Sequence, residues 1–160
     1  MSEKVLRRWV VDALRPLHAF AVENPVNPGT PDVECTLCWI ELKHVEEAPV
    51  RVDTVLAVPH YTPQQRFWAR QRNIAGGCSF MLIQVSSEFL LFRGEDAAHY
   101  VGYYPLQFLR ERALVLWKTK PSPSQFLNSI ISLHRSWNRE VLFSRLVRSS
   151  SSSVEDKTGH

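Results

Sequence analysis

The sequence predicts an α/β domain in which helices flank a mixed central sheet, and three observations lead to this fold class. An amphipathic helical pattern opens the chain, a strand, a helix and a second strand follow one another between residues 32 and 85, and a further apolar helical stripe lies near the C-terminus. A strand, a helix and a strand in this order form the βαβ unit of α/β folds. The 160 residues, of which 44% are hydrophobic and 11% aromatic, suffice for one domain with a sizeable core.

The first helix is predicted at the N-terminus. Ser2 can cap it, and Pro16 lies near its end. Its apolar residues recur at three- and four-residue spacing: Leu6, Trp9, Val10, Ala13, Leu14 and Leu17. Residues 24–31 then hold three prolines and a glycine, a composition typical of a loop, and this loop leads directly to Asp32.

A β-hairpin is predicted from Asp32 to Lys43, because these residues are rich in strand formers and a tight reversal fits near Thr36 and Leu37. Side chains alternate along a strand, so Glu41 and Lys43 point to the same face. Trp39 shares that face, whereas the two apolar residues between these positions point to the other one.

A second helix begins at Thr62, which can act as the cap, with Pro63 at the first helical position and Gln65 three residues after the cap. The pair Gly76-Gly77 ends this helix. A buried strand is predicted over residues 78–85, and another over residues 88–92 after a short Ser-Ser turn.

The pattern is weaker after residue 93. Residues 113–117 are expected to form a further strand, and a C-terminal helix that runs past His134 is expected to cover the sheet. Its apolar face consists of Phe126, Leu127, Ile130 and Ile131. We therefore expect one domain over residues 1–148, followed by a serine-rich, polar tail over residues 149–160 that is disordered.

The composition favours a protein of the cytoplasm. No apolar stretch reaches the roughly 18 residues that suggest a membrane span, and no charged-then-apolar leader opens the chain. We therefore expect no membrane partner. Three cysteines, an odd count in a chain without an export signal, are expected to be reduced.

The paired acidic residues predict a site for a hard divalent cation. Asp32 and Glu41 offer two carboxylates, and the backbone carbonyl of Leu42 adds a third oxygen, which suits Mg²⁺ or Mn²⁺. A metal ion there would polarise a phosphodiester and lower the pKa of a bound water, while Lys43 would position that water and offset developing charge.

These residues resemble the active-site motif of the PD-(D/E)XK nuclease superfamily. The segments that carry the resemblance are Gly29-Thr30-Pro31-Asp32, Trp39-Ile40-Glu41-Leu42-Lys43, Thr62-Pro63-Gln64-Gln65 and Gly76-Gly77. Together they look most like the small VRR-NUC and Holliday-junction-resolvase-like nucleases carried by many phages, over roughly the first 95 residues. The resemblance implies a restriction-endonuclease-like αβββαβ core, Asp32 and Glu41 as metal ligands, and Lys43 as the catalytic lysine. It places Gln65 beside the site.

Two features depart from the family pattern. Eight residues, 33–40, separate Asp32 from Glu41, so the hairpin must be very tight. The acidic ligand that many members contribute from the first helix can be Glu3 or Glu23, with Asp12 a poorer fit. We expect Glu3 to complete the metal site.

Other side chains near the motif have two possible roles. Gln65 can serve the site or only close the capping box with Thr62. Arg66, Arg70 and Arg72 can form a phosphate-contacting edge for DNA or a solvated helix face. The five tryptophans, including Trp39 and Trp68, are expected to pack in or near the core and not to stack on bases.

The sequence thus predicts a Mg²⁺- or Mn²⁺-dependent endodeoxyribonuclease. A role on branched or Holliday-junction DNA is implied only by the resemblance. Such a role would favour a homodimer, because two symmetric cuts call for two sites. If the chain is phage-encoded, the expected location is the cytoplasm of the host cell. One alternative is a non-catalytic nucleic-acid-binding module with the same fold. Another is a zinc-stabilised interaction domain built on Cys35, Cys38 and His44.

Overall fold

A six-stranded mixed sheet forms the centre of the protein in the computed structural model, which describes residues 1–155. The strands are β1 (Phe20–Ala21), β2 (Val33–Glu34), β3 (Trp39–Val45), β4 (Ser79–Val85), β5 (Glu88–Arg93) and β6 (Val115–Trp117), and they lie side by side in chain order. The helices are α1 (Glu3–Ala13), α2 (Pro63–Ile74), α3 (Gly94–Tyr100), α4 (Leu106–Arg112) and α5 (Pro123–Glu155), and η1 (Arg15–Leu17) is a 3₁₀ turn. The predicted class, α/β with a mixed sheet flanked by helices, is confirmed.

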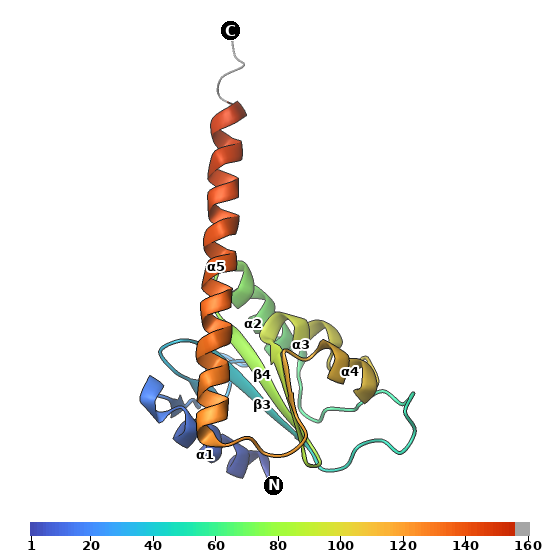
Figure 1. Cartoon of the computed structure of the whole chain (residues 1–160). Coiled ribbons are helices and arrows are strands. Elements are labelled where there is room, and N and C mark those ends of the chain that lie inside the picture. The colour runs from blue at the N-terminus through green and yellow to red at the C-terminus, as the bar shows by residue number, and fades with distance from the viewer. Residues whose placement is uncertain (156–160) are drawn as a thin grey trace.

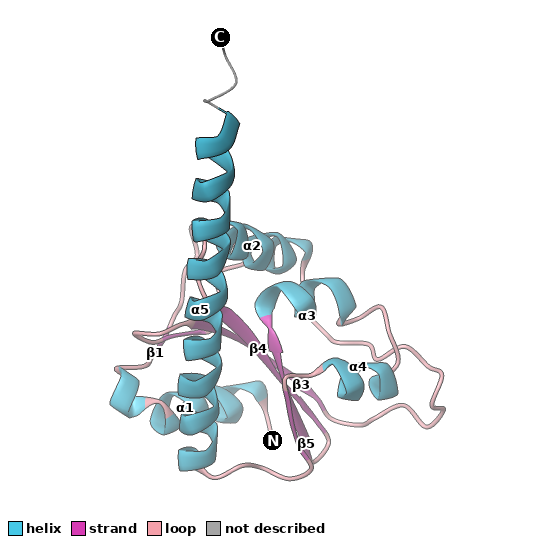
Figure 2. Cartoon of the chain, turned by 45° about the horizontal axis from the view of Figure 1, so that its top comes forward, coloured by secondary structure: helices cyan, strands magenta, loops and turns pink. Residues whose placement is uncertain are grey.

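Helices cover both faces of the sheet (Figures 1 and 2). On one face, Ile40 and Leu82 pack with Leu6 of α1 and Phe126 of α5. On the other face, side chains such as Met81 pack with α3 and α4. The alternation of side chains along β3, β4 and β5 separates these two apolar clusters, so each face of the sheet has its own core.

The predicted elements around the motif are present. Ser2 caps α1 by accepting a hydrogen bond from the backbone N–H of Val5, and β2 and β3 form an antiparallel hairpin. Strand β3 then runs parallel to β4, with α2 as the crossover between them, as the βαβ prediction requires. Strands β5 and β6 follow in antiparallel order.

Three short elements were not predicted. Strand β1 has two residues, both exposed, so no alternating pattern marks it. Helices α3 and α4 are seven residues each, and neither has a side chain that caps its N-terminus. They form because they bury one face against the sheet, and this tertiary stabilisation leaves little trace in a short sequence window.

Helix α5 is longer than predicted. Its first half packs on α1 and the sheet, and its second half extends away from the domain (Figure 1). We expected disorder from Ser149, whereas the helix continues to Glu155; residues 156–160 lie outside the described residues. Extending an existing helix adds one backbone hydrogen bond per residue, so polar serines need not end it.

Among the residues that the structure describes, no helix has both the length and the apolar character needed to cross a lipid bilayer.

Candidate active site

The β2–β3 hairpin places Asp32 opposite Glu41. Val33 pairs with Ile40 in the antiparallel register. Continuing this register by one residue, to the position just before β2, places Asp32 opposite Glu41. Residues directly opposite each other in an antiparallel pair project from the same face of the sheet. The turn is tight enough for the eight-residue spacing, because the N–H of Cys35 donates to the carbonyl of Cys38 at 3.0 Å and closes the hairpin.

Pro31 cannot donate a backbone hydrogen bond to Leu42. The same register, continued by one more residue, places Pro31 opposite Leu42. The Leu42 N–H faces this edge, because it donates to Asp32 Oδ2 at 2.9 Å, and the carbonyl of the same residue points in the same direction. Proline has no N–H to donate to that carbonyl. The Leu42 N–H thus contacts the carboxylate of Asp32, and the role of the Leu42 carbonyl as a third ligand stays a prediction.

Glu41 is a buried carboxylate with one satisfied and one unsatisfied oxygen. Its side chain is 6% exposed. Oε1 lies 2.7 Å from Lys43 Nζ and accepts a hydrogen bond from Gln65 Nε2, also at 2.7 Å. Among the described residues, Oε2 is buried without a hydrogen-bond partner. A buried, unpaired carboxylate oxygen is costly, and a bound cation would satisfy it.

The surroundings of Glu41 favour its protonated form when no cation is bound. Burial raises the pKa of Glu41 to about 8, and the nearby charge of Asp32 acts in the same direction. The ammonium of Lys43 opposes this shift without cancelling it. An unpaired oxygen and a raised pKa are both expected of a carboxylate that needs a positive partner.

Lys43 is buried next to Glu41, as the alternation along β3 predicts. It is 2% exposed, and its ammonium forms an ion pair with the Glu41 carboxylate. A lysine is almost never this deeply buried without a partner, so the ion pair accounts for its position. The ammonium lies on the face where Asp32 and Glu41 meet.

Asp32 is held by α1 as well as by β3. Arg7 Nη2 donates to Asp32 Oδ1 at 2.8 Å, while Asp32 Oδ2 accepts from the Leu42 N–H. The sequence did not identify this arginine as part of the site. Its position could have indicated a role: Arg7 lies one helical turn after Glu3, so the two side chains are neighbours on the surface of α1.

Glu3 is the best placed of the three acidic candidates from the N-terminal region. Its charge raises the pKa of Glu41, which places it near the site. Asp12 instead pairs with Arg15 on the surface, and Glu23 is exposed in the loop after β1. Within the described part of the chain, no group of three or more His, Cys, Asp or Glu side chains could hold a metal ion. The carboxylates of Asp32 and Glu41 are thus the predicted ligands that the structure brings together.

Gln65 has both of the roles that the sequence left open. Its side-chain oxygen accepts from the Thr62 N–H at 3.0 Å, and Thr62 Oγ1 accepts from the Gln65 N–H at 3.2 Å, which completes the capping box. The amide nitrogen of the same side chain donates to Glu41. One glutamine therefore fixes the start of α2 and orients the buried carboxylate.

The three arginines of α2 do not form one basic edge. Arg66 is buried, stacks on the rings of Tyr61 and Tyr103, and donates to the carbonyl of Ala98 at 3.1 Å. Arg66 therefore joins α2 to α3 and is not part of an exposed basic edge, although a phosphate contact was predicted for it. This contact could not be predicted, because α3 itself was not predicted.

Arg70 and Arg72 differ from Arg66 in exposure. Arg70 is half-buried and donates to the same Ala98 carbonyl at 3.3 Å. Arg72 is exposed, and its guanidinium lies over the rings of Trp39 and Trp68. Of the three, Arg72 is the one whose charge faces solvent.

The cysteines lie behind the hairpin, in the core beneath α1. The turn brings Cys35 and Cys38 to the same side, with their sulfur atoms 3.6 Å apart, and Cys78 is buried in the same cluster. Burial raises the pKa of Cys78 to about 12. All three are free thiols. Because the described residues contain no set of three metal-ligating side chains, the zinc alternative gains no support.

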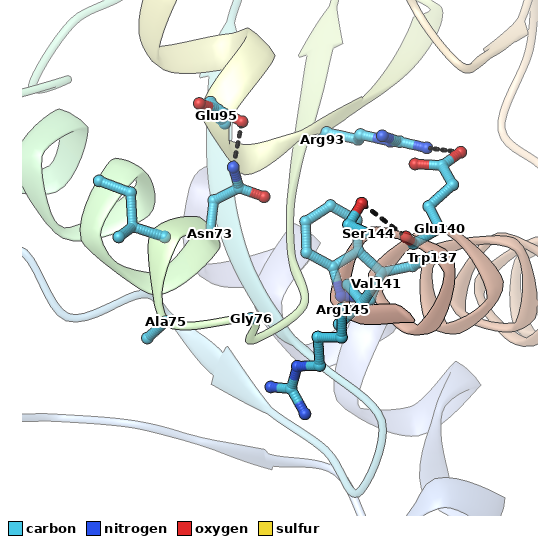
Figure 3. Close-up of a pocket in the computed structure, with 11 residues that line it drawn as sticks. Asn73, Ala75, Gly76, Arg93, Glu95, Trp137, Glu140, Val141, Ser144 and Arg145 are labelled. Atoms are coloured by element: carbon cyan, nitrogen blue, oxygen red, sulfur yellow. Dashed lines mark hydrogen bonds and ion pairs between the residues drawn. The ribbon is translucent and has the colours of Figure 1, made fainter. Parts of the chain in front are cut away.

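A separate pocket lies between the end of α2 and α5, away from the motif (Figure 3). It has a volume of about 460 Å³. Its charged side chains are largely paired: Arg93 lies 2.8 Å from Glu140, and Asn73 donates to Glu95. None of the predicted site residues lines it. The residues that the sequence singles out therefore lie outside this pocket.

Comparisons of this chain with protein-family models, with curated proteins and with solved structures found no match.

Proposed function

We propose that the protein is a metal-dependent endodeoxyribonuclease of the PD-(D/E)XK type that uses Mg²⁺ or Mn²⁺. The observation that carries this proposal is the convergence of Asp32, Glu41 and Lys43 on one face of the β2–β3 hairpin, around a buried carboxylate oxygen that lacks a partner. Two carboxylates and a backbone carbonyl are hard oxygen ligands, which both cations prefer.

The residues present fit such an ion. Asp32, Glu41 and the Leu42 carbonyl would hold it, and Glu41 Oε2 would gain the positive partner that it lacks. When bound, the ion would act as a Lewis acid on the phosphodiester and make a bound water more acidic.

The other residues of the site have roles that follow from their contacts. Lys43 would hold the attacking water and stabilise negative charge that develops on the phosphate, because its ammonium is fixed beside Glu41 in a buried position. Gln65 would keep the Glu41 carboxylate in one orientation. Both groups are already in place before substrate binds, and such preorganisation lowers the cost of reaching the transition state.

The order of elements also supports the proposal. The chain runs α1, β1, β2, β3, α2 and β4, which is the αβββαβ order that the resemblance implies for a restriction-endonuclease-like core. Asp32 directly precedes β2, Glu41 and Lys43 lie on β3, and α2 supplies Gln65. Action on branched DNA and a homodimeric assembly remain predictions of the resemblance.

A non-catalytic DNA-binding module is the second candidate, and the contacts of Asp32 favour it. Both oxygens of this carboxylate are already engaged, one by Arg7 and one by the Leu42 N–H. If Arg7 permanently replaces the cation, the site would bind nucleic acid without cutting it. Such binding would weaken with salt, as counterion release requires, and would not depend on divalent metal.

A cleavage panel distinguishes the two functions. Purified protein is incubated with labelled single-stranded, duplex, flap, fork and four-way-junction DNA in Mg²⁺, Mn²⁺ or EDTA, beside the variant Asp32→Asn. The nuclease proposal predicts cleavage that requires metal and is lost in the variant. Salt-sensitive binding without cleavage of any substrate would reject it in favour of the binding module.

A further inference from the structure

A groove of about 690 Å³ lies beside the candidate active site, between the loop before β2 and helix α2. Six of the residues that line it are Thr30, Trp39, Gln64, Phe67, Trp68 and Arg72. The groove adjoins the motif on three segments of the chain: Thr30 is two residues before Asp32, Trp39 is two before Glu41, and Gln64 precedes Gln65. The groove therefore lies next to the segments that carry the two carboxylates.

Three aromatic side chains line this groove and remain accessible. Phe67 is 61% exposed, and Trp39 and Trp68 are half-buried, with ring centroids 5.5 Å apart. The sequence predicted that both tryptophans pack in or near the core, but each keeps part of its surface at the groove. Flat, rigid rings at an open site are suited to stacking on flat ligands.

The charge of the groove is positive. Arg72 lies with its guanidinium carbon 5.8 Å from the ring centre of Trp68 and 5.9 Å from that of Trp39. No acidic side chain is found among the described residues that line the groove, and the remaining polar ones are amides and hydroxyls such as Gln71 and Asn27. Aromatic rings combined with a cation and amide groups favour a ligand that has both π faces and negative charge.

The loop that forms one wall of the groove packs closely on α2. Gly29 has a φ of +94°, and a Cβ atom at this position would lie 2.6 Å from the backbone carbonyl carbon and oxygen of Gln64. The loop thus contacts the first turn of α2 so closely that only glycine fits there. The groove is thus present in the structure without a ligand.

We propose that this groove binds unpaired bases of a single-stranded segment and guides the adjoining phosphate to Asp32 and Glu41. Bases in a duplex are stacked on each other, so their faces cannot reach Trp39, Phe67 or Trp68. The inference deepens the proposed nuclease function, on which it rests for the location of the cut. Such a groove would favour substrates with a single-stranded part, such as single strands, flaps and forks, over continuous duplex.

Binding in EDTA tests the groove independently of cleavage. Fluorescence anisotropy gives the Kd of a labelled oligothymidine and of a duplex of equal length. The proposal predicts that the single strand binds more tightly than the duplex. Phe67→Ala should weaken single-strand binding by about five- to 150-fold, since base stacking on an aromatic side chain contributes roughly 1–3 kcal/mol. Arg72→Ala should also weaken it, because the groove loses its positive charge. Phe143→Ala is the matched control, because this side chain is 70% exposed on the distant half of α5 and its loss should leave the Kd unchanged.

Either of two results would overturn the inference: duplex bound as tightly as single strand, or single-strand affinity unaffected by both groove variants. An aromatic groove also suits proline-rich peptides, so binding of such a peptide in place of the oligonucleotide would reject the inference as well. A different result would reject the nuclease proposal. Intact single-strand binding in EDTA, with no cleavage when Mg²⁺ or Mn²⁺ is added, would remove the catalytic role and keep the groove.

Discussion

Gln65 donates a hydrogen bond to Glu41 across 2.7 Å, so the first turn of α2 holds the buried carboxylate that β3 presents. The same side chain closes the capping box with Thr62. A contact that stabilises a helix end and a contact that orients the candidate metal ligand are thus made by a single residue.

Variants at Thr62 and Gln65 separate these two contacts. Thr62→Ala removes the cap alone and should lower the free energy of unfolding by about 1 kcal/mol with little effect on cleavage. Gln65→Ala should have a similar effect on stability and also reduce the cleavage rate by about tenfold or more, because Glu41 loses its orienting donor. Urea unfolding and single-turnover cleavage measure the two quantities. Equal cleavage by both variants would restrict Gln65 to a capping role.

The stability of the metal-free protein should fall as the pH rises. The pKa of Glu41 is about 8 in the folded protein, against an ordinary value of 4.5, so ionisation of this residue opposes folding. Its contribution to stability is complete below about pH 4.5 and is lost as the pH rises through about 8. Melting temperatures in EDTA should show this decline, and Glu41→Gln should remove most of it.

Divalent cations should reverse the same effect, because they bind the ionised carboxylate. At pH 8, added Mg²⁺ or Mn²⁺ should raise the melting temperature of the wild-type protein and not that of Glu41→Gln. An identical rise in both proteins would show that the cation binds elsewhere.

Arg7 should compete with the metal ion for Asp32. Its guanidinium occupies Asp32 Oδ1, so Arg7→Ala should lower stability in EDTA by about 0.5–1 kcal/mol and raise the affinity for Mn²⁺ on the order of tenfold. Arg7→Lys keeps the charge and is the matched control. Calorimetric titration with Mn²⁺ measures the affinity; weaker binding by Arg7→Ala would mean that the arginine supports the metal site.

Gly29 should tolerate no side chain. Gly29→Ala combines a left-handed backbone with a collision against Gln64, and we expect it to destabilise the protein by about 2 kcal/mol or more and to weaken single-strand binding. Gly76→Ala is the control: it has a similar positive φ, but its nearest neighbour is the end of the flexible Arg145 side chain, so about 1 kcal/mol is expected. If urea unfolding shows the same loss of stability for Gly29→Ala and Gly76→Ala, the collision with Gln64 does not contribute.

The local structure of the motif could be predicted from the sequence because short-range signals determine it. The capping box at Thr62, the turn at Thr36 and Leu37, and the alternation that aligns Glu41 with Lys43 depend on residues close in the chain, and the structure contains all three. The β3–α2–β4 crossover follows from the order of those elements.

Contacts between distant segments could not be predicted in this way. Arg7 reaches Asp32 across 25 positions, and Arg66 is buried by α3, which has no cap and little periodicity of its own. The approach of Asp32 to the Leu42 N–H also depends on register, because only the folded hairpin brings these two residues together.

Cleavage by a Lys43 variant tests the central claim most directly. Lys43→Met keeps the length and the apolar stem of a side chain that is 2% exposed, and Lys118→Met, at an exposed lysine that pairs with Glu88, is the control. Nicking of plasmid DNA in Mn²⁺ is measured for both variants and for the wild type, with circular dichroism to verify folding. The nuclease account predicts that folded Lys43→Met loses at least 100-fold in rate, on the order expected for removal of a transition-state charge, while Lys118→Met cuts normally. Wild-type cleavage rates in folded Lys43→Met, or no metal-dependent cleavage by the wild type, would contradict it.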